Sequence, residues 1–355
     1  MLILCFQSKA QTFDKIKELA VKYIAGDTNK TVNFEYDTNF VKSYRDVLNI
    51  TFVAVNRNLD ISVKNSNDVL RSINYSTNNG MSFGFGLDYK WLGVEFSTKF
   101  GFLNNKEPKK LNTEKFGLRI GLTGRKFWFN GTLQLYKGLH ISNPTIFDAN
   151  YFTNNYFYPA RPDISSLALF ASLYYSFNNK RYSNLAATFQ LEKQKKSAGT
   201  FLTGISASLN DLKADRSLVP ENLKAFYPNQ ILLNESTTKG VCINFGYAHN
   251  FIIKKHFFIN LALIPGLGIQ SNYSKNELKE ESFYRRKLGV MVDSRFSLGY
   301  NGDLFYAGIL NTSNSFIGNE KRGGLLDFDY SYFRFFVGIR LPVEIKNPTL
   351  KKIFK

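Results

Sequence analysis

The most constraining feature of the sequence is a period-two alternation, which is clearest in the stretch YFRFFVGIRL at residues 332–341. One set of alternate residues is wholly apolar: Phe333, Phe335, Val337, Ile339 and Leu341. The other set contains two arginines: Tyr332, Arg334, Phe336, Gly338 and Arg340. Successive side chains of a β-strand point to opposite faces, so this period predicts a strand.

The same alternation recurs in six other stretches, namely residues 82–90, 92–100, 116–123, 183–193, 241–251 and 287–300. In each stretch the apolar set carries no charge at its centre, while the opposite set mixes Gly, Ser, Asn and full charges. A soluble sandwich would not give its outer face to so many glycines. A barrel in lipid has an apolar outside and a polar inside, and its closure pairs every backbone group. We therefore predict an all-β fold, a closed antiparallel transmembrane β-barrel, rather than a soluble sandwich.

Composition supports this class. Of 355 residues, 44% are hydrophobic and 16% are aromatic, which excludes a disordered chain. The mean hydropathy is only −0.23. The sequence contains no run of about 18 apolar residues, so it predicts no transmembrane helix. The formal net charge is +18, but the basic clusters lie between the expected strands and form no compact basic motif. We expect contacts with outer-membrane lipids and lipopolysaccharide, and no nucleic acid.

The expected strands are residues 47–57, 69–75, 81–90, 92–101, 115–124, 126–137, 164–177, 181–194, 198–208, 238–251, 255–269, 285–299, 302–313 and 326–341. This set has 14 members, and barrels of this class have even numbers of strands, so we expect about 14 and allow 12–16. Short and long connections should alternate between the two ends, but the alternation breaks between residues 180 and 238. The interpretation that restores it is a hidden strand within 209–237, in the stretch QILLNES.

The chain ends suggest further segments. Residues 1–10 resemble a signal peptide, possibly truncated at its start, in which Cys5 is an alternative lipoprotein site. Residues 11–46 are expected to form an N-terminal periplasmic helix, at 12–24, and a lead-in to the barrel at 47–341. Residues 342–355 form a basic C-terminal tail. Loss of Cys5 on cleavage leaves Cys242 with no disulfide partner.

Four stretches resemble a known Gram-negative family: YDTNFV (36–41), LEKQKKSAGTFLTG (191–204), SLVPENL (217–223) and KKHFFINLALIPGLGIQ (254–270). They are similar to the family catalogued as domain of unknown function 4421. The family has Tyr-x-Pro-Asn where this chain has the sequence from Tyr75 to Asn78, a small departure. The resemblance implies an outer-membrane β-barrel, a location in the cell outer membrane and insertion by the barrel-assembly machinery. It implies no particular activity.

Charged residues of the inward set form the main candidate site: Asp88, Glu95, Arg119, Glu192, Asp293, Arg295, Arg334 and Arg340. We expect Arg334 and Arg295 to pair with carboxylates such as Asp293. One interpretation is an ion-pair network that plugs a narrow barrel. The other is a selectivity lining for a small polar solute, since 12 to 16 strands can enclose a channel.

The stretch KQKKSAG offers a second candidate, a contact for lipid or lipopolysaccharide phosphate formed by Lys193, Lys195, Lys196 and Ser197. The alternative is a basic turn at a membrane edge. No metal motif, cofactor motif or Gly-x-Ser-x-Gly elbow is evident. His140 begins a loop next to Ser142, but ordinary loop or interfacial positions are the favoured interpretation of all three histidines. The sequence therefore favours a structural barrel or a plugged pore for small solutes, with a lipid-directed hydrolase or lipopolysaccharide-binding protein as the alternative.

Overall fold

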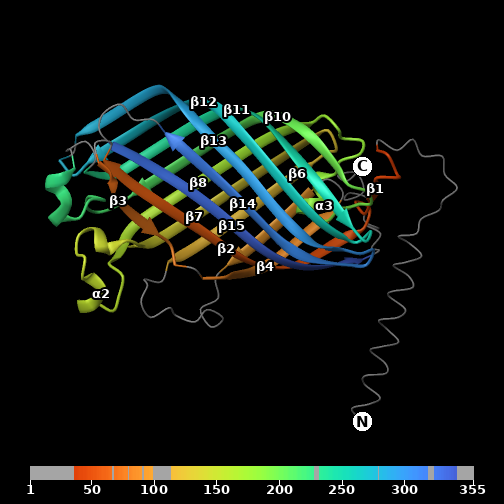
Figure 1. Cartoon of the computed structure of the whole chain (residues 1–355), viewed down its shortest axis with the longest axis horizontal. Helices are drawn as coiled ribbons and strands as arrows, with labels where there is room; N and C mark the ends of the chain where they lie inside the picture. The colour runs from red at the N-terminus through yellow and green to blue at the C-terminus, as the bar shows by residue number, and fades with distance from the viewer. Residues whose placement is uncertain are drawn as a thin grey trace, which may run out of the picture.

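The structure is a computed structural model, and it describes residues 36–65, 68–78, 80–89, 92–98, 113–227, 232–278, 280–318 and 324–341. Its strands form one tilted ring, seen from the side in Figure 1. No helix in these ranges is long and apolar enough to cross a membrane. The short helices are η1 (Pro144–Ile146), α2 (Tyr151–Asn154), α3 (Asn184–Thr188) and η2 (Glu221–Phe226).

Fifteen strands are found in the described part of the chain. They are β1 (Val41–Ser43), β2 (Leu48–Asn65), β3 (Asp68–Ser76), β4 (Ser82–Tyr89), β5 (Leu92–Thr98), β6 (Glu114–Thr123), β7 (Phe127–Ile141), β8 (Ala160–Ser176), β9 (Glu192–Gln194), β10 (Ala198–Lys213), β11 (Leu233–Ile253), β12 (Phe257–Asn276), β13 (Glu281–Asn301), β14 (Phe305–Gly318) and β15 (Gly324–Leu341).

Thirteen of these strands form the antiparallel ring, and it closes where β15 pairs with β2 and where β7 pairs with β6. The other edge of β2 pairs with two strands. Its residues from Asp60 onward pair with β3, and its residues from Asn49 to Val55 pair with β4. β3 and β4 therefore occupy one position of the ring, which leaves twelve positions. The predicted closed antiparallel barrel is confirmed, with an even number of positions at the lower end of the expected range.

Burial follows the predicted alternation. On β11, Ile243 is 72% exposed on the outside, while its neighbour Asn244 is fully buried inside. On β15, Phe335 is 41% exposed and Arg334 is 1% exposed. The stretch at 332–341 thus turns its apolar set toward lipid and its arginines toward the interior, as period two predicts in a transmembrane barrel.

The two ends of the barrel differ. One end carries short links between strands, at residues 124–126, 254–256 and 302–304; we call it the short-turn end. The other end carries the links 142–159 and 214–232, and we call it the long-loop end. In Figure 1, α2 lies at the long-loop end, while β1 and α3 lie at the short-turn end.

A segment of the chain fills the barrel at the short-turn end. β1 pairs with β9 as a separate two-stranded sheet, with Val41 opposite Gln194 and Ser43 opposite Glu192. α3 precedes β9, and the Ser183 hydroxyl caps it by accepting from the Ala186 amide at 3.0 Å. We call residues 36–47 and 182–194 the plug.

The interior at the long-loop end contains an apolar cluster, beside polar contacts such as those of Arg161 with the Arg216 and Ser217 carbonyls. Leu218, Val219, Leu223 and Tyr227, from the link between β10 and β11, pack against inward residues of the wall. The wall contributes Leu59, Ile61, Ile73, Tyr75, Leu139, Ile164, Phe170 and Leu212. The Tyr75 hydroxyl donates to the Leu218 carbonyl. The barrel is therefore filled from both ends, by polar chain at one and by an apolar cluster at the other.

One expected strand was wrong. Residues 181–194 are α3, β9 and connecting chain inside the barrel, and Leu185, Phe189 and Leu191 pack together there instead of facing lipid. Removing this strand brings the links of the two halves of the chain back into phase, because residues 177–197 then join β8 to β10 at the short-turn end. The hidden strand in QILLNES is also wrong, because β11 itself begins at Leu233. The signal peptide, the helix at 12–24 and the tail at 342–355 lie outside the described residues.

Candidate functional site in the lumen and plug

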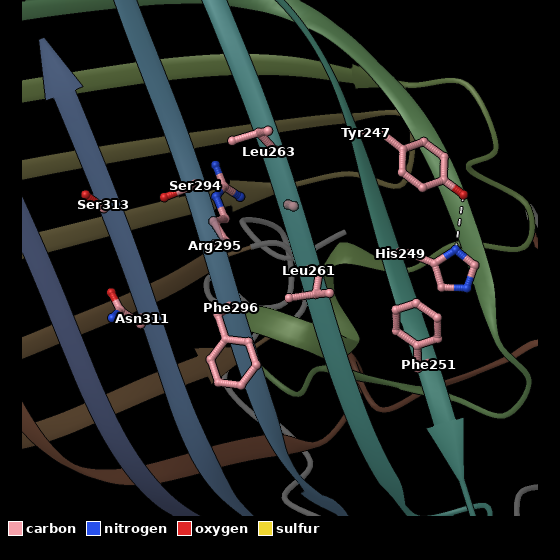
Figure 2. A pocket seen from close by; sticks show the side chains of 11 residues that line it. Tyr247, His249, Phe251, Leu261, Leu263, Ser294, Arg295, Phe296, Asn311 and Ser313 are labelled. Atoms are coloured by element: carbon pink, nitrogen blue, oxygen red, sulfur yellow. Dashed lines mark hydrogen bonds between the residues drawn. The ribbon is translucent and has the colours of Figure 1, made fainter.

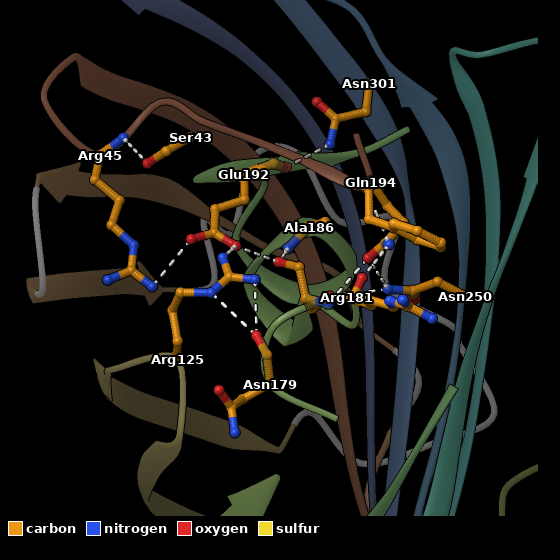
Figure 3. A network of polar contacts seen from close by, with 12 residues as sticks. Ser43, Arg45, Arg125, Asn179, Arg181, Ala186, Glu192, Gln194, Asn250 and Asn301 are labelled. Carbon is orange, nitrogen blue, oxygen red and sulfur yellow. Dashed lines mark hydrogen bonds and ion pairs between the residues drawn. The ribbon is translucent and has the colours of Figure 1, made fainter. Parts of the chain in front are cut away.

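Glu192 is the centre of the contacts that hold the plug (Figure 3). Its Oε2 lies 2.6 Å from Arg125 Nη1, and its Oε1 lies 3.0 Å from Arg45 Nη2. The Ser183 hydroxyl donates to Oε2 at 2.6 Å. Arg125 belongs to the turn between β6 and β7, so one carboxylate joins the plug to the wall. Glu192 is 1% exposed, and burial makes such a pair costly to break.

Wall side chains also bind the backbone of the plug. Asn301 Nδ2 donates to the Glu192 carbonyl at 2.9 Å, and Asn250 Nδ2 donates to the Ser183 carbonyl at 2.8 Å. Ser297 donates to the Ala187 carbonyl at 3.0 Å. These bonds come from β13 and β11, on the far side of the lumen from Arg125. The plug is therefore held from more than one side, largely by polar groups.

Arg340, fully buried on β15, holds the turn between α3 and β9. It donates to the carbonyls of Gln190 and Gly302 and to Asn301 Oδ1, the last at 2.7 Å. Its guanidinium lies 3.9 Å from the centre of the Tyr44 ring. Gln190 has φ of 57°, a left-handed conformation that is rare for a residue with a side chain. Arg340 thus stabilises a strained turn in the plug.

Asp303 lies in the turn between β13 and β14, and three polar side chains of the plug contact its carboxylate. The Tyr44 hydroxyl donates to its carboxylate, Lys42 Nζ lies 3.1 Å away and Lys193 Nζ lies 3.7 Å away. Partial burial raises the pKa of Asp303, but the Tyr44 hydrogen bond and the two ammonium groups outweigh burial and lower it to about 2. The carboxylate is therefore ionised at neutral pH and attracts the plug.

A charge cluster lies deeper in the lumen. Arg334 Nε on β15 lies 2.6 Å from Glu95 Oε2 on β5, and the Tyr332 hydroxyl donates to Glu95 Oε1. The Arg119 guanidinium lies 4.8 Å from the ring centre of Phe189, a plug residue, and 5.5 Å from that of Tyr332. This cluster connects the wall to the plug through a cation–π contact.

A second pair lies on β13 itself. Arg295 Nη2 lies 2.6 Å from Asp293 Oδ2, and Tyr174 donates to the same oxygen at 3.0 Å. The Arg295 guanidinium also lies 5.0 Å from the Trp128 ring. Both arginines pair with carboxylates of the predicted lumen set, Arg295 with Asp293 and Arg334 with Glu95.

The eight predicted lumen residues all lie inside the barrel and are at most 8% exposed. Asp88 lies opposite Gly93, where an added Cβ would meet its Oδ1 at 2.3 Å. Glu192 lies inside on the plug and not on a wall strand. The sequence reasoning missed Arg45, Arg125, Asp303 and Tyr44. Arg57 was also missed, although its inward parity on β2 could have identified it; it donates to Ser97 Oγ at 2.7 Å.

The four residues of the predicted phosphate contact lie in different environments. Lys193 is buried in the plug, with its Nζ 3.0 Å from His256 Nδ1. Lys195 is exposed and donates to the Thr38 carbonyl at 2.8 Å. Lys196 lies 5.5 Å from the centre of the Phe40 ring, and Ser197 Oγ accepts from the Ile252 amide at 2.9 Å. The four residues do not converge on one ligand position.

No group of three or more His, Cys, Asp or Glu side chains that could hold a metal ion is found in the described ranges. The fold and the site together define a transmembrane β-barrel whose lumen contains a plug. The model of the family described as "domain of unknown function (DUF4421)" matches residues 35–340, and the chain belongs to this family. No curated protein matches the chain.

Solved structures with a similar arrangement include three bacterial proteins. The outer membrane protease OmpT of Escherichia coli is 7% identical, with a TM-score of 0.35 over 84% of this chain and 97% of that one. The toluene transporter TodX of Pseudomonas putida is 9% identical, with a TM-score of 0.26 over 84% and 91%. The translocator domain of the autotransporter NalP of Neisseria meningitidis is 8% identical, with a TM-score of 0.28 over 97% and 100%.

Proposed function

We propose that this chain is an outer-membrane barrel that is closed at rest, and that its plug controls the passage of small polar solutes. The observation that carries the proposal is the way the plug is held. Ion pairs and hydrogen bonds at Glu192, Arg340 and Asp303 join it to the wall. Polar contacts can be exchanged for water when the plug moves, whereas an apolar core resists such exposure.

The outward apolar face supports a location in the outer membrane, in contact with lipids and lipopolysaccharide. By the usual orientation of such barrels, the short-turn end and its plug face the periplasm. The barrel-assembly machinery would insert the chain.

We propose no enzymatic activity. His249 Nδ1 lies 3.1 Å from the Tyr247 hydroxyl, and His256 Nδ1 lies 3.0 Å from Lys193 Nζ. Neither neighbour is a serine or cysteine nucleophile of the kind that a hydrolase site needs. The geometry at these two histidines therefore gives no support to a lipid-directed hydrolase.

The test is the conductance of purified protein in planar bilayers. Wild-type protein should be nearly silent, and Glu192→Gln should open measurable channels, because the neutral amide leaves Arg125 and Arg45 without their carboxylate. Asp211→Asn is the matched control, since Asp211 lies on the outer face of β10 and pairs there with Lys213. Slower migration on a gel after boiling checks that each variant folds. A large wild-type conductance, or silence of Glu192→Gln, would contradict the proposal.

A further inference from the structure

Four arginines of the described barrel wall each carry a terminal nitrogen that is buried without a hydrogen-bond partner. They are Arg57 on β2, Arg119 on β6, Arg295 on β13 and Arg334 on β15, and we call them the arginine cluster. All four side chains are at most 8% exposed. The unpartnered atoms are Nη2 of Arg57 and Nη1 of the other three. Buried donors normally have acceptors, so the cluster has spare capacity for a ligand that accepts hydrogen bonds.

Three of these arginines lie around one carboxylate and one aromatic ring. The guanidinium carbons of Arg57 and Arg119 lie 5.2 and 5.5 Å from the centre of the Tyr332 ring. Arg334 Nε lies 2.6 Å from Glu95 Oε2, and the charges of Arg57 and Arg119 act on the same carboxylate. The three side chains therefore converge on one region of the lumen.

Arg295 reaches this region from the opposite wall, because β13 lies across the ring from β6. Its neighbour Ser294 faces the other way and borders a groove of about 560 Å³ on the outside of the barrel (Figure 2). Arg295 itself is buried in the lumen, where its charge acts on Arg119. The cluster thus draws guanidinium groups from both sides of the lumen.

The carboxylates that pair with the cluster already accept hydrogen bonds at both oxygens. Glu95 accepts from Arg334 Nε at one oxygen and from the Tyr332 hydroxyl at the other. Asp293 accepts from Arg295 at both of its oxygens. A guanidinium group can only donate, so the unused groups of the cluster are donors. A ligand that satisfies them must supply acceptor atoms.

The buried charge of the wall favours the same kind of ligand. Arg161 and Arg340 bind backbone carbonyls of the loops and the plug. Apart from these two, the buried charges of the described wall are the cations Arg57, Lys115, Arg119, Arg295 and Arg334 and the carboxylates Asp88, Glu95 and Asp293. The cations are in excess, and an excess of one sign in a region of low dielectric attracts the opposite charge.

The plug covers the cluster in this structure. The ring centre of Phe189 lies 4.8 Å from the Arg119 guanidinium carbon. The same ring packs on β5 and β6, where an added Cβ at Gly93 would lie 3.6 Å from its Cδ1 and one at Gly121 would lie 2.6 Å from its Cζ. When the plug moves, the space that Phe189 leaves adjoins Arg119.

We propose that the arginine cluster binds small oxyanions, such as phosphate or carboxylates, and that these are the solutes whose passage the plug controls. This inference rests on the proposed function, because the plug has to move before an anion reaches the cluster. A guanidinium group binds an oxyanion through parallel N–H bonds, and arginines that line a pore favour anions. The paired carboxylates limit the excess charge, so a bound anion can also leave.

The first test measures the reversal potential of Gly121→Val channels in a gradient of potassium chloride. The added side chain displaces Phe189 and changes no charge. The channels should prefer chloride, and adding Arg119→Gln should shift the potential toward that of potassium, whereas Arg119→Lys should keep the preference. Lys239→Gln is the matched control, because Lys239 is exposed on the outer face of β11. Cation-selective channels, or equal shifts from Arg119→Gln and Lys239→Gln, would overturn the inference.

The second test is equilibrium dialysis of purified Gly121→Val protein against radiolabelled phosphate, which needs no conductance. Arg119→Gln should weaken phosphate binding roughly tenfold or more, and Lys239→Gln should leave it unchanged. Phosphate binding that depends on Arg119 in a protein that never conducts would support the anion site and contradict the role of the plug. Open channels that bind no phosphate would overturn the anion site and leave the role of the plug intact. Absence of both conductance and binding would contradict both.

Discussion

At the residue scale, the lumen depends on charges that are buried together. Arg334 with Glu95, and Arg125 with Glu192, are pairs in which both side chains are at most 4% exposed. Removing one member of such a pair leaves an uncompensated charge, which costs about 3–5 kcal/mol in buried examples. These pairs therefore fix where the wall and the plug meet.

Asp303 makes the attachment of the plug dependent on pH. Its pKa is lowered to about 2, below the ordinary value of about 3.9. A carboxyl group whose pKa is lowered by its partners stabilises the docked plug fully above about pH 4 and loses that effect as the pH falls toward 2. We expect bilayer conductance to rise over this window. In Asp303→Asn, which has no carboxylate to protonate, the rise should be absent and the conductance at pH 5 already higher.

At the element scale, the sequence predicted the wall strands well because period two has only one explanation along most of the chain. β13 and β15 were expected at 285–299 and 326–341 and are found at Glu281–Asn301 and Gly324–Leu341. The plug could not be predicted, because residues 181–194 also alternate. Their apolar side chains pack with one another inside the barrel, and a local pattern does not distinguish that environment from lipid.

The inward glycines explain how the wall accommodates the plug. At Gly121 on β6, an added Cβ would lie 2.6 Å from Cζ of Phe189. We expect Gly121→Val to displace the plug and raise conductance roughly tenfold or more, because overpacking costs about 1–3 kcal/mol. Adding Phe189→Ala to this variant should reverse the effect. Gly86→Ala is the control, since its added Cβ would lie 3.5 Å from the nearest atom, Thr51 Cβ. An equal effect of both substitutions would argue against a local clash.

At the scale of the whole molecule, the two ends of the lumen are closed by different chemistry. Polar contacts hold the plug at the short-turn end, and apolar packing around Leu218 and Tyr227 fills the long-loop end. Exposing the second region to water costs the free energy of the apolar area that becomes wet, so it should be the more permanent closure. Polar substitutions should therefore release the plug first, and we expect openings of the apolar end to be brief.

The outward residues of the strands determine where lipid meets the barrel. On β11 the outward face from Ile253 to Val241 is apolar or aromatic except for His249, and it becomes charged at Lys239. We expect Phe245→Arg to cost roughly 2–4 kcal/mol of folding free energy in bilayers, because a charge near the midplane faces hydrocarbon. Thr237→Arg, outward on the same strand beyond Lys239, should cost about 1 kcal/mol or less and can pair with Asp211, which accepts from Thr237 Oγ1 at 2.6 Å. Urea unfolding in liposomes measures both values, and similar costs at the two positions would show that the lipid boundary lies elsewhere on β11.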